Sequence, residues 1–471
     1  MSSPNRRHLT MSGNRQWLFG TVMLGAVNLL TACGSSSSSG TLVARWVSGA
    51  DIVNQNGVYG TLGTAAPSNV PGAREGAVSW TDSNGHLGHL WLFGGLGHDS
   101  TGNIDRLNDL WRFDGRQWTW VSGADVVDQQ GVYGTQGTAS PSNVPGARAY
   151  AISWIDSAGN LWLFGGYGYD SAGNLGYLND LWRFDGYQWT WIDGSDVVNQ
   201  QGVYGMQGTA APSNVPGARD GAISWIDSIG NLWLFGGGGY DSALNLGGLN
   251  DLWKYDGSQW TWVSGADVIN QEGVYGAMGT ASPSNVPGAR TDAVSWIDQS
   301  GNLWLFGAGG GLDSAGNLGF LNDLWRFDGS QWTWVSGNDV INQKGVYGMQ
   351  GTADPSNVPG ARGGAISWID STGNLWLFGG AGWDSAAIGG ELNDLWRYDG
   401  SQWTWVSGAD DVNQQGIYGT KGTASPSNAP GARRRAVSWI DLSGNLWLFG
   451  GIGYESTVAL DLLNDLWELT P

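Results

Sequence analysis

Apolar and polar residues alternate in short runs along most of the chain, and the same runs return at a nearly fixed interval. The string Leu-Trp-Leu-Phe-Gly starts at residues 90, 161, 232, 303, 375 and 446, which are 71 or 72 residues apart. Asn-Asp-Leu-Trp and Pro-Gly-Ala-Arg recur with almost the same spacing. Self-similarity on this scale predicts a repeat architecture in which each unit packs on its neighbours.

Each unit contains four runs with a period of two, which is the pattern of a half-buried strand. In the second unit, the predicted strands are residues 151–156, 161–166, 181–185 and 188–192. The last two runs flank Asp185-Gly186, a pair suited to a tight hairpin turn. A single small sheet cannot bury both of its faces, so the sheets must stack around an axis. The predicted fold class is all-β, a six-bladed β-propeller of four-stranded antiparallel blades.

The two ends of the repeat region hold complementary parts of one blade. Residues 41–49 match the fourth-strand segment of a unit, and residues 463–469 match a third strand that no fourth strand follows. We expect the N-terminal segment to complete the last blade, because this pairs two edges that would otherwise stay open. The propeller is therefore expected to span residues 41–471.

The repeat resembles that of the kelch family, which includes the propeller domain of galactose oxidase. In the second unit the matching features are Arg148, the pair Gly165-Gly166, Trp182 in the third strand, and Trp189 or Trp191 in the fourth. The pair becomes Gly307-Ala308 in the fourth unit. Each unit also exceeds a kelch repeat of about 50 residues, because an insert precedes the first strand. The resemblance implies a propeller fold.

Residues 1–32 show the order of a secretory signal, with arginines first and an apolar run after them. Leu30-Thr31-Ala32-Cys33 resembles the lipobox of bacterial lipoproteins, which implies that Cys33 is lipidated. Residues 33–40 then form a serine-rich tether. By analogy with lipoprotein sorting, Gly34 after the cysteine indicates the outer membrane. The prediction is an exported protein of the bacterial cell envelope. The alternative is an ordinary secretory signal with a chance cysteine.

Composition limits the possible partners. The formal net charge is −20, which argues against a nucleic-acid ligand. With a single cysteine the chain cannot form an intramolecular disulfide. We expect contact with a membrane through the lipid anchor alone.

Positions that differ among otherwise constant copies predict a ligand site on the loops at one face, around the mouth of the central channel. One set opens the first strands: Glu75, Tyr150, Asp220, Asp292, Arg434 and Arg435. The other set follows the second strands, each member before an acid: His98, Tyr169, Tyr240, Leu312, Trp383 and Tyr454. Aromatic rings beside carboxylates suit sugars, and they suit a peptide equally well.

Two repeated features have both a binding and a structural interpretation. The arginines that end Pro-Gly-Ala-Arg either contact the ligand or bond acids and carbonyls of the blades; they are Arg74, Arg148, Arg219, Arg290, Arg362 and Arg433. The Asp-Ser-Ala-Gly-Asn segments either bind calcium or are simple turns, and they lack the spacing of an EF-hand. No other cofactor or metal is predicted.

The leading functional hypothesis is a lipid-anchored, cell-surface propeller that binds a glycan or a protein at its loop face without catalysis. One alternative is a sugar-modifying enzyme, an epimerase, isomerase or lyase, that uses the carboxylates at the channel mouth. Another is a structural envelope protein. Galactose oxidase chemistry is excluded, because its copper site needs a tyrosine cross-linked to a cysteine and the predicted propeller body contains no cysteine.

Overall fold

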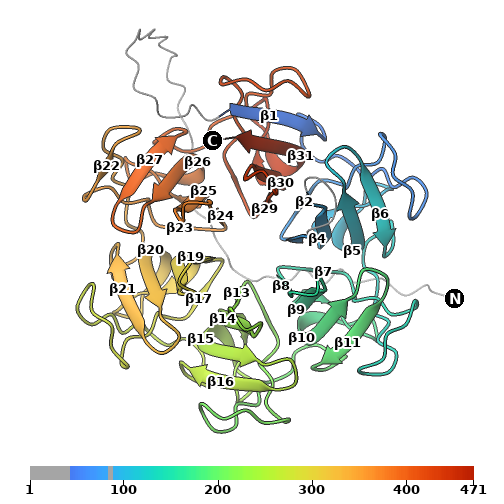
Figure 1. The fold of residues 1–471 in the computed structure, drawn as a ribbon, viewed down its shortest axis with the longest axis horizontal. Helices are drawn as coiled ribbons and strands as arrows, with labels where there is room; N and C mark the ends of the chain where they lie inside the picture. Colours follow the sequence, from blue (N-terminus) through green and yellow to red (C-terminus); the bar gives the residue numbers. More distant parts are fainter. Residues whose placement is uncertain (1–42, 83–87, 471) are drawn as a thin grey trace, which may run out of the picture. The chain divides into compact units, whose positions relative to one another are not determined.

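The structure is a computed structural model that describes residues 43–82 and 88–470. These residues form six antiparallel sheets arranged in a ring, a six-bladed β-propeller, as the repeats predicted (Figure 1). No helix in this part of the chain is long and apolar enough to cross a membrane. The predicted signal, the lipidated Cys33 and the tether lie outside the described residues, as does His86.

The first five blades follow one plan, from the axis outward. Blade 1 contains β2 (Arg74–Glu75), β3 (Val78–Thr81), β4 (Leu90–His98), β5 (Ile104–Phe113) and β6 (Trp118–Ser122). Blade 2 contains β7 (Arg148–Ala149), β8 (Ile152–Ile155), β9 (Leu161–Tyr169), β10 (Leu175–Phe184) and β11 (Trp189–Asp193). Blade 3 contains β12 (Arg219–Asp220), β13 (Ile223–Ile226), β14 (Leu232–Tyr240), β15 (Leu246–Tyr255) and β16 (Trp260–Ser264).

The remaining blades vary this plan at their outer edges. Blade 4 contains β17 (Arg290–Thr291), β18 (Val294–Ile297), β19 (Leu303–Leu312), β20 (Leu318–Phe327) and β21 (Trp332–Ser336). Blade 5 contains β22 (Ala353–Asp354), β23 (Arg362–Gly363), β24 (Ile366–Ile369), β25 (Leu375–Trp383), β26 (Gly389–Tyr398) and β27 (Trp403–Ser407). Blade 6 contains β28 (Arg433–Arg434), β29 (Val437–Ile440), β30 (Leu446–Tyr454), β31 (Leu460–Thr470) and β1 (Val43–Ser48).

The strands differ from the sequence prediction in two ways. The innermost strand is broken into two pieces that pair with the same neighbour, as β7 and β8 both pair with β9. The second and third strands are also longer than predicted, because the segment between them closes in a tight turn: the Asp170 N–H donates to the Asn174 carbonyl at 3.0 Å.

The long inserts cover the outer edges of the blades. In blade 2 the Gly137 N–H donates to the Trp191 carbonyl of β11 at 2.7 Å, and the Asn143 Nδ2 donates to the Trp189 carbonyl at 3.1 Å. In blade 5 the insert forms the strand β22, which pairs with β27. The inserts were expected to lie on the loop face. They start there, but they then descend to shield an edge that would otherwise be open.

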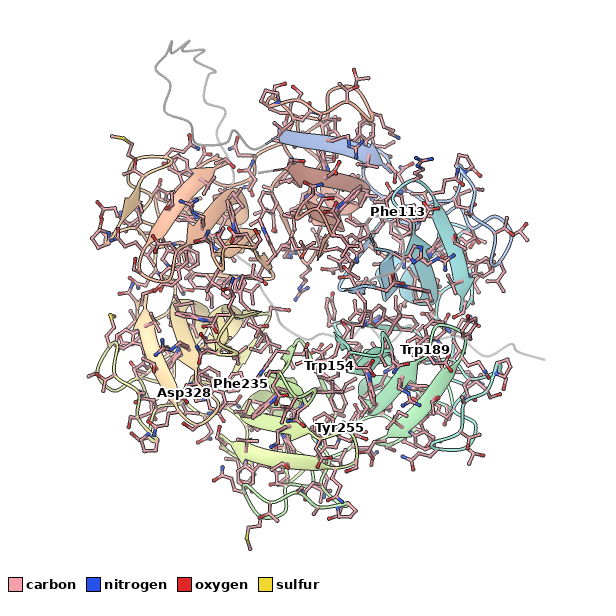
Figure 2. All side chains as sticks on the ribbon, in the orientation of Figure 1. Phe113, Trp154, Trp189, Phe235, Tyr255 and Asp328 are labelled. Atoms are coloured by element: carbon pink, nitrogen blue, oxygen red, sulfur yellow. The ribbon has the colours of Figure 1, made fainter. Side chains whose placement is uncertain are left out.

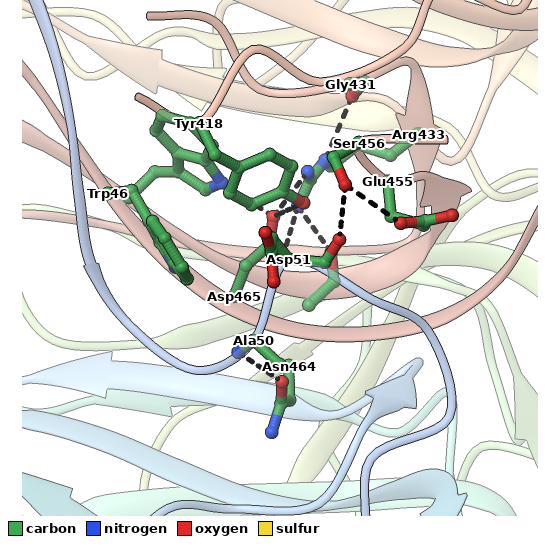
Figure 3. A network of polar contacts seen from close by, with 12 residues as sticks. Trp46, Ala50, Asp51, Tyr418, Gly431, Arg433, Glu455, Ser456, Asn464 and Asp465 are labelled. Atoms are coloured by element: carbon green, nitrogen blue, oxygen red, sulfur yellow. Dashed lines mark hydrogen bonds and ion pairs between the residues drawn. The ribbon is translucent and has the colours of Figure 1, made fainter. Parts of the chain in front are cut away.

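The N-terminal strand closes the ring. β1 pairs with β31, with Ala44 opposite Leu469. On its other side the Gly422 N–H of the insert donates to the Trp46 carbonyl at 2.7 Å. Beyond the strand, the Ala50 N–H donates to the Asn464 Oδ1 at 3.0 Å (Figure 3). The predicted closure of the last blade is confirmed, and β1 is hydrogen-bonded along both edges.

The hydrophobic core lies between blades rather than within them. At the junction of blades 1 and 2, Trp80 and Phe93 pack in one cluster with Leu163 and Trp182. The Trp80 indole N–H donates to the Trp162 carbonyl across the same junction at 3.3 Å. An equivalent cluster occupies each of the six junctions. Each sheet is thus stabilised by its two neighbours.

Candidate functional site

Each Pro-Gly-Ala-Arg arginine lies inside its own blade. Arg148 is 1% exposed and makes a bidentate ion pair with Asp180, with both N–O distances 2.7 Å. Although burial disfavours its charge, the Asp180 carboxylate raises the pKa of Arg148. The Tyr133 hydroxyl of the insert donates to Asp180 at 2.6 Å. The same arrangement holds Arg74, Arg219, Arg290, Arg362 and Arg433.

These six ion pairs therefore have a structural role. The arginine N–H groups that face Asp180 and the carbonyls of Gly146 and Gly165 leave one of the five donors of Arg148 without a protein partner. None of the six arginines is more than 1% exposed. Buried in this way, the six guanidinium groups stand apart from the variable residues at the channel mouth.

Six residues form a closed ring of backbone hydrogen bonds around the axis. Each N–H donates to the carbonyl of the preceding blade's residue, at 2.7–3.1 Å. All six have φ between 54° and 64°. In chain order they are Gly76, Tyr150, Gly221, Asp292, Gly364 and Arg435. This ring is the physical cause of the break in every innermost strand.

Glycine alternates with larger residues around this ring. Tyr150, Asp292 and Arg435 hold the left-handed conformation that costs a residue with a Cβ about 1–2 kcal/mol. The other three copies avoid that cost with glycine. Backbone strain that a sister copy avoids indicates that the three side chains have a use at the axis.

The side chains at the axis bond to one another. Arg435 lies 2.9 Å from the Asp292 Oδ2 and 3.3 Å from the Glu75 Oε2, and the Tyr150 hydroxyl donates to the Glu75 Oε1 at 2.8 Å. The Arg435 guanidinium also lies 4.7 Å from the centre of the Tyr150 ring. We call Glu75, Tyr150, Asp292 and Arg435 the axial cluster. It borders a cavity of about 150 Å³ on the ring of backbone bonds.

Burial sets the protonation states of this cluster. It raises the pKa of Tyr150, helped by the neighbouring Glu75 carboxylate. Burial opposes the charge of Arg435, but the Asp292 carboxylate holds its pKa well above the usual value. The cluster therefore contains a neutral tyrosine and a permanently charged arginine near neutral pH.

Arg434 and Asp220 do not join the axial cluster. Arg434 forms an ion pair with Glu391 of the neighbouring blade. Glu391 is 4% exposed and its Oε2 has no hydrogen-bond partner. Burial raises the pKa of Glu391 to about 7, although the arginine works in the opposite direction. Asp220 lies on β12, opposite Gly238 in the next strand.

The second set of variable residues lies at the outer ends of the second strands, one in each blade. His98 is 6% exposed and its Nε2 lies 3.2 Å from the Asn54 Oδ1, and burial lowers its pKa. The Trp383 indole donates to the Asn342 Oδ1 at 3.2 Å. Leu312 is buried. Tyr169, Tyr240 and Tyr454 are half-buried. Apart from Tyr240, these residues do not gather at one place.

The acids that follow this set organise turns. The Asp170 Oδ1 accepts the N–H groups of Ala172 and Asn174 at 2.9 and 2.8 Å. Asp170 is fully buried. Within the described residues, no three histidine, cysteine, aspartate or glutamate side chains gather as a metal site would require. The geometry of these segments is that of a turn whose carboxylate accepts backbone donors.

The sequence analysis missed an aromatic group on blade 2. Tyr167 pairs in register with Ala149 on one side and with Tyr177 on the other, so the positions lead outward from the axis. The Tyr167 and Tyr177 ring centres are 5.0 Å apart, and Tyr177 lies 5.9 Å from Tyr240 of blade 3. All three rings are half-buried. We call Tyr167, Tyr177 and Tyr240 the tyrosine strip.

A cation completes the tyrosine strip. The Arg106 guanidinium of blade 1 lies 5.0 Å from the centre of the Tyr167 ring. The signal that could have revealed this group is the residue after Gly-Gly, which varies among the copies as much as the residues after Pro-Gly-Ala-Arg do. In blade 3 the positions of Tyr167 and Tyr177 are Gly238 and Gly248. The fold itself therefore requires no aromatic ring at either position.

No protein-family model and no curated protein sequence matches this chain. Among solved structures, one titled as the structure of YjhT is 14% identical, with a TM-score of 0.48, over 85% of this chain and 99% of that chain. A fungal alcohol oxidase of the AA5 family, in complex with copper, is 13% identical, with a TM-score of 0.45, over 87% and 77% of the two chains. Likeness at this identity concerns the fold alone.

Proposed function

We propose that the protein is a non-catalytic, lipid-anchored propeller of the bacterial cell envelope that binds a glycan on its loop face, over the tyrosine strip. The observation that carries the proposal is the contrast between copies. The positions of Tyr167 and Tyr177 are both glycine in blade 3, so the rings are additions to a backbone that does without them. Such additions on a rigid scaffold are typical of a binding surface.

The geometry of the strip suits sugar rings. Neighbouring strands of a sheet lie about 4.8 Å apart, so the register from Ala149 through Tyr167 to Tyr177 gives a graded row from the axis outward. Half-buried tyrosines present an apolar face for stacking and a hydroxyl for hydrogen bonding. Arg106, which is 20% exposed, adds a hydrogen-bond donor at one side.

The axial cluster supports binding over catalysis. A general acid or base needs a pKa near the working pH. The pKa of Tyr150 is raised by burial, away from neutrality, and its hydroxyl donates to Glu75. Asp292 is held by the Arg435 ion pair. Mutual pairing of this kind argues against the sugar-modifying alternative and favours a rigid base beside the strip.

The position of the anchor supports an outward-facing loop face. Val43 of β1 pairs with Thr470, whereas the loop-face end of β31 is Leu460. The chain therefore enters the ring at the opposite face, ten residues after Cys33. Ten residues span at most about 35 Å. A lipid on Cys33 would keep that opposite face toward the membrane and leave the tyrosine strip accessible.

A glycan array probed with the lipid-free protein tests the proposal. The double variant Tyr167→Gly/Tyr177→Gly reproduces residues of blade 3, so it should fold and should bind at least about tenfold more weakly to any glycan that the parent retains. The control is Ile229→Ser, which changes an 84% exposed residue on the opposite face to the residue of the next copy. Equal binding by the double variant and the control would overturn the proposal.

A further inference from the structure

A second cavity lies far from the axis, at the outer junction of blades 1 and 2. It has a volume of about 370 Å³, at the lower end of the range for small-molecule sites. Blade 1 contributes Ser122, and the insert of blade 2 contributes Asn143. The turn between β10 and β11 contributes Tyr187, and β11 contributes Trp189, which Figure 2 labels near this junction. We call this space the junction cavity.

Three lining residues of the junction cavity carry buried polar atoms without a hydrogen-bond partner. They are the Ser122 hydroxyl, the Asn143 Oδ1 and the Trp189 indole nitrogen. Asn143 is 4% exposed and Trp189 is 1% exposed. A buried donor or acceptor left unpaired costs about 1–3 kcal/mol, so an occupant that can both donate and accept is favoured here.

The rest of the lining is uncharged. Amides, hydroxyls and aromatic rings supply its polar and apolar surface, and no Asp, Glu, Lys, Arg or His is among the lining residues. Gln129, Gln130 and Gln188 add amide groups to that of Asn143. An occupant with hydroxyl groups and an apolar ring face, and without a charge, matches this surface.

Tyr187 distinguishes this junction from its sister sites. Its side chain is 89% exposed, which is rare for a tyrosine without a partner. The same turn position holds Ser258, Ser330 and Ser401 in the next three copies. The turn needs no aromatic residue, because Asp185 and Gly186 set its conformation.

We propose that the junction cavity is a second saccharide site, which takes a neutral pyranose between Trp189 and Tyr187. The sugar hydroxyls bond the Ser122 hydroxyl, the Asn143 Oδ1 and the Trp189 N–H, and the exposed Tyr187 ring packs against the sugar. The site is built from insert and turn residues and shares none of its lining with the tyrosine strip or the axial cluster. Its existence does not depend on the loop-face proposal.

Two variants borrow from sister copies and should therefore fold. Tyr187→Ser installs the residue of the next three copies, and Ser122→Asp installs the residue that blade 2 has at Asp193. The matched control is Ser264→Asp, which makes the same change at the end of β16 in another junction. The probes are methyl glycosides of neutral hexoses and N-acetylhexosamines, with charged sugars as comparison.

Binding is measured by saturation-transfer NMR and calorimetry on the full chain without its leader, in the Tyr167→Gly/Tyr177→Gly background that removes the strip. We expect a neutral pyranoside to bind with one site per chain, and both Tyr187→Ser and Ser122→Asp to weaken it about tenfold or more while Ser264→Asp does not. Unchanged binding in Tyr187→Ser and Ser122→Asp, or binding of charged sugars alone, would overturn the proposal, as would a crystal soaked in the probe that shows water in the cavity. If the loop-face proposal alone is wrong, the background variant will bind glycans as the parent does, with this site intact.

Discussion

Arg219 and Asp251 form a fully buried bidentate ion pair, with N–O distances of 2.6 and 2.7 Å. The pair joins parts of one blade that are far apart in sequence, because Arg219 opens the first strand and Asp251 belongs to the third. The Tyr204 hydroxyl of the insert donates to the same carboxylate at 2.7 Å. One ion pair thus ties the insert and two strands of the blade together, and each of the six blades contains a copy.

Removal of the charge on Asp251 should destabilise the protein strongly. Asp251→Asn leaves the Arg219 guanidinium buried without a counter-charge, which typically costs about 3–5 kcal/mol. Tyr204→Phe is the control, because it deletes one hydrogen bond and should cost about 1 kcal/mol. Denaturant unfolding measures both. If Asp251→Asn lost no more stability than Tyr204→Phe, the ion pair would not be the centre of the blade.

The backbone ring at the axis should tolerate a Cβ poorly at its glycines. Gly221 has φ of +59° and the nearest atom to an added Cβ is 3.5 Å away, so Gly221→Ala has room and meets backbone strain alone. We expect a loss of about 1 kcal/mol. Gly248→Ala is the control, because Gly248 does not have a positive φ and its nearest contact is an ordinary 3.4 Å. Equal stability of the two variants would argue that the ring stores no strain.

Glu391 should make the protein less stable as the pH rises. Burial raises the pKa of Glu391 from 4.5 to about 7. The folded state therefore binds this proton more tightly than the unfolded state, so the stabilisation is complete below pH 4.5 and is lost as the pH rises through 7. Glu391→Gln should flatten the fall in Tm between about pH 5 and 8. The Arg434 ion pair limits the size of the effect.

Asp370 provides a control of opposite sign for this measurement. Hydrogen bonds to its side chain, from Thr372, Trp376 and Asn374, outweigh burial and lower its pKa to about 2. Its contribution to stability is present above 3.8 and is lost as the pH falls toward 2. Asp370→Asn should therefore change the acid limb of the Tm profile and leave the neutral range unchanged. A neutral-range profile that is the same for Glu391→Gln and the parent would contradict the role of Glu391.

The sequence predicted the blades because their pattern is local. Alternation, turn residues and a constant interval specify each sheet, and the unmatched end segments specified how the ring closes. The insert was harder to interpret. Tyr133 looked like part of a repeated loop, and its burial against Asp180 depends on how the insert folds back over the edge of the blade. Arg148 and Asp180 belong to two motifs with the same interval, and this shared interval was an unused sign that they pair.

The candidate site was less predictable, because its contacts cross between blades. The ring around the axis gives Tyr150 and Arg435 positive φ values, and the meeting of Arg435 with Glu75 follows from closure of the ring. Neither is a local property of the sequence. Tyr167 and Tyr177 are close because two strands are in register, and that register was predicted too short to include them.

The strand β1 should contribute more to stability than its length suggests. Deletion through residue 48 exposes an edge of β31 and an edge of the blade 6 insert at once, and it removes Trp46, whose ring lies 5.1 Å from that of Tyr418. We expect this truncation to lower Tm sharply and to cause aggregation, because both open edges can pair with other chains. Trp46→Ala leaves the backbone pairing intact and should cost about 3–5 kcal/mol from lost packing. Deletion of residues 35–39 is the control and should leave Tm unchanged. Equal melting temperatures for the two truncations, measured by calorimetry, would mean that the ring does not depend on its N-terminal strand.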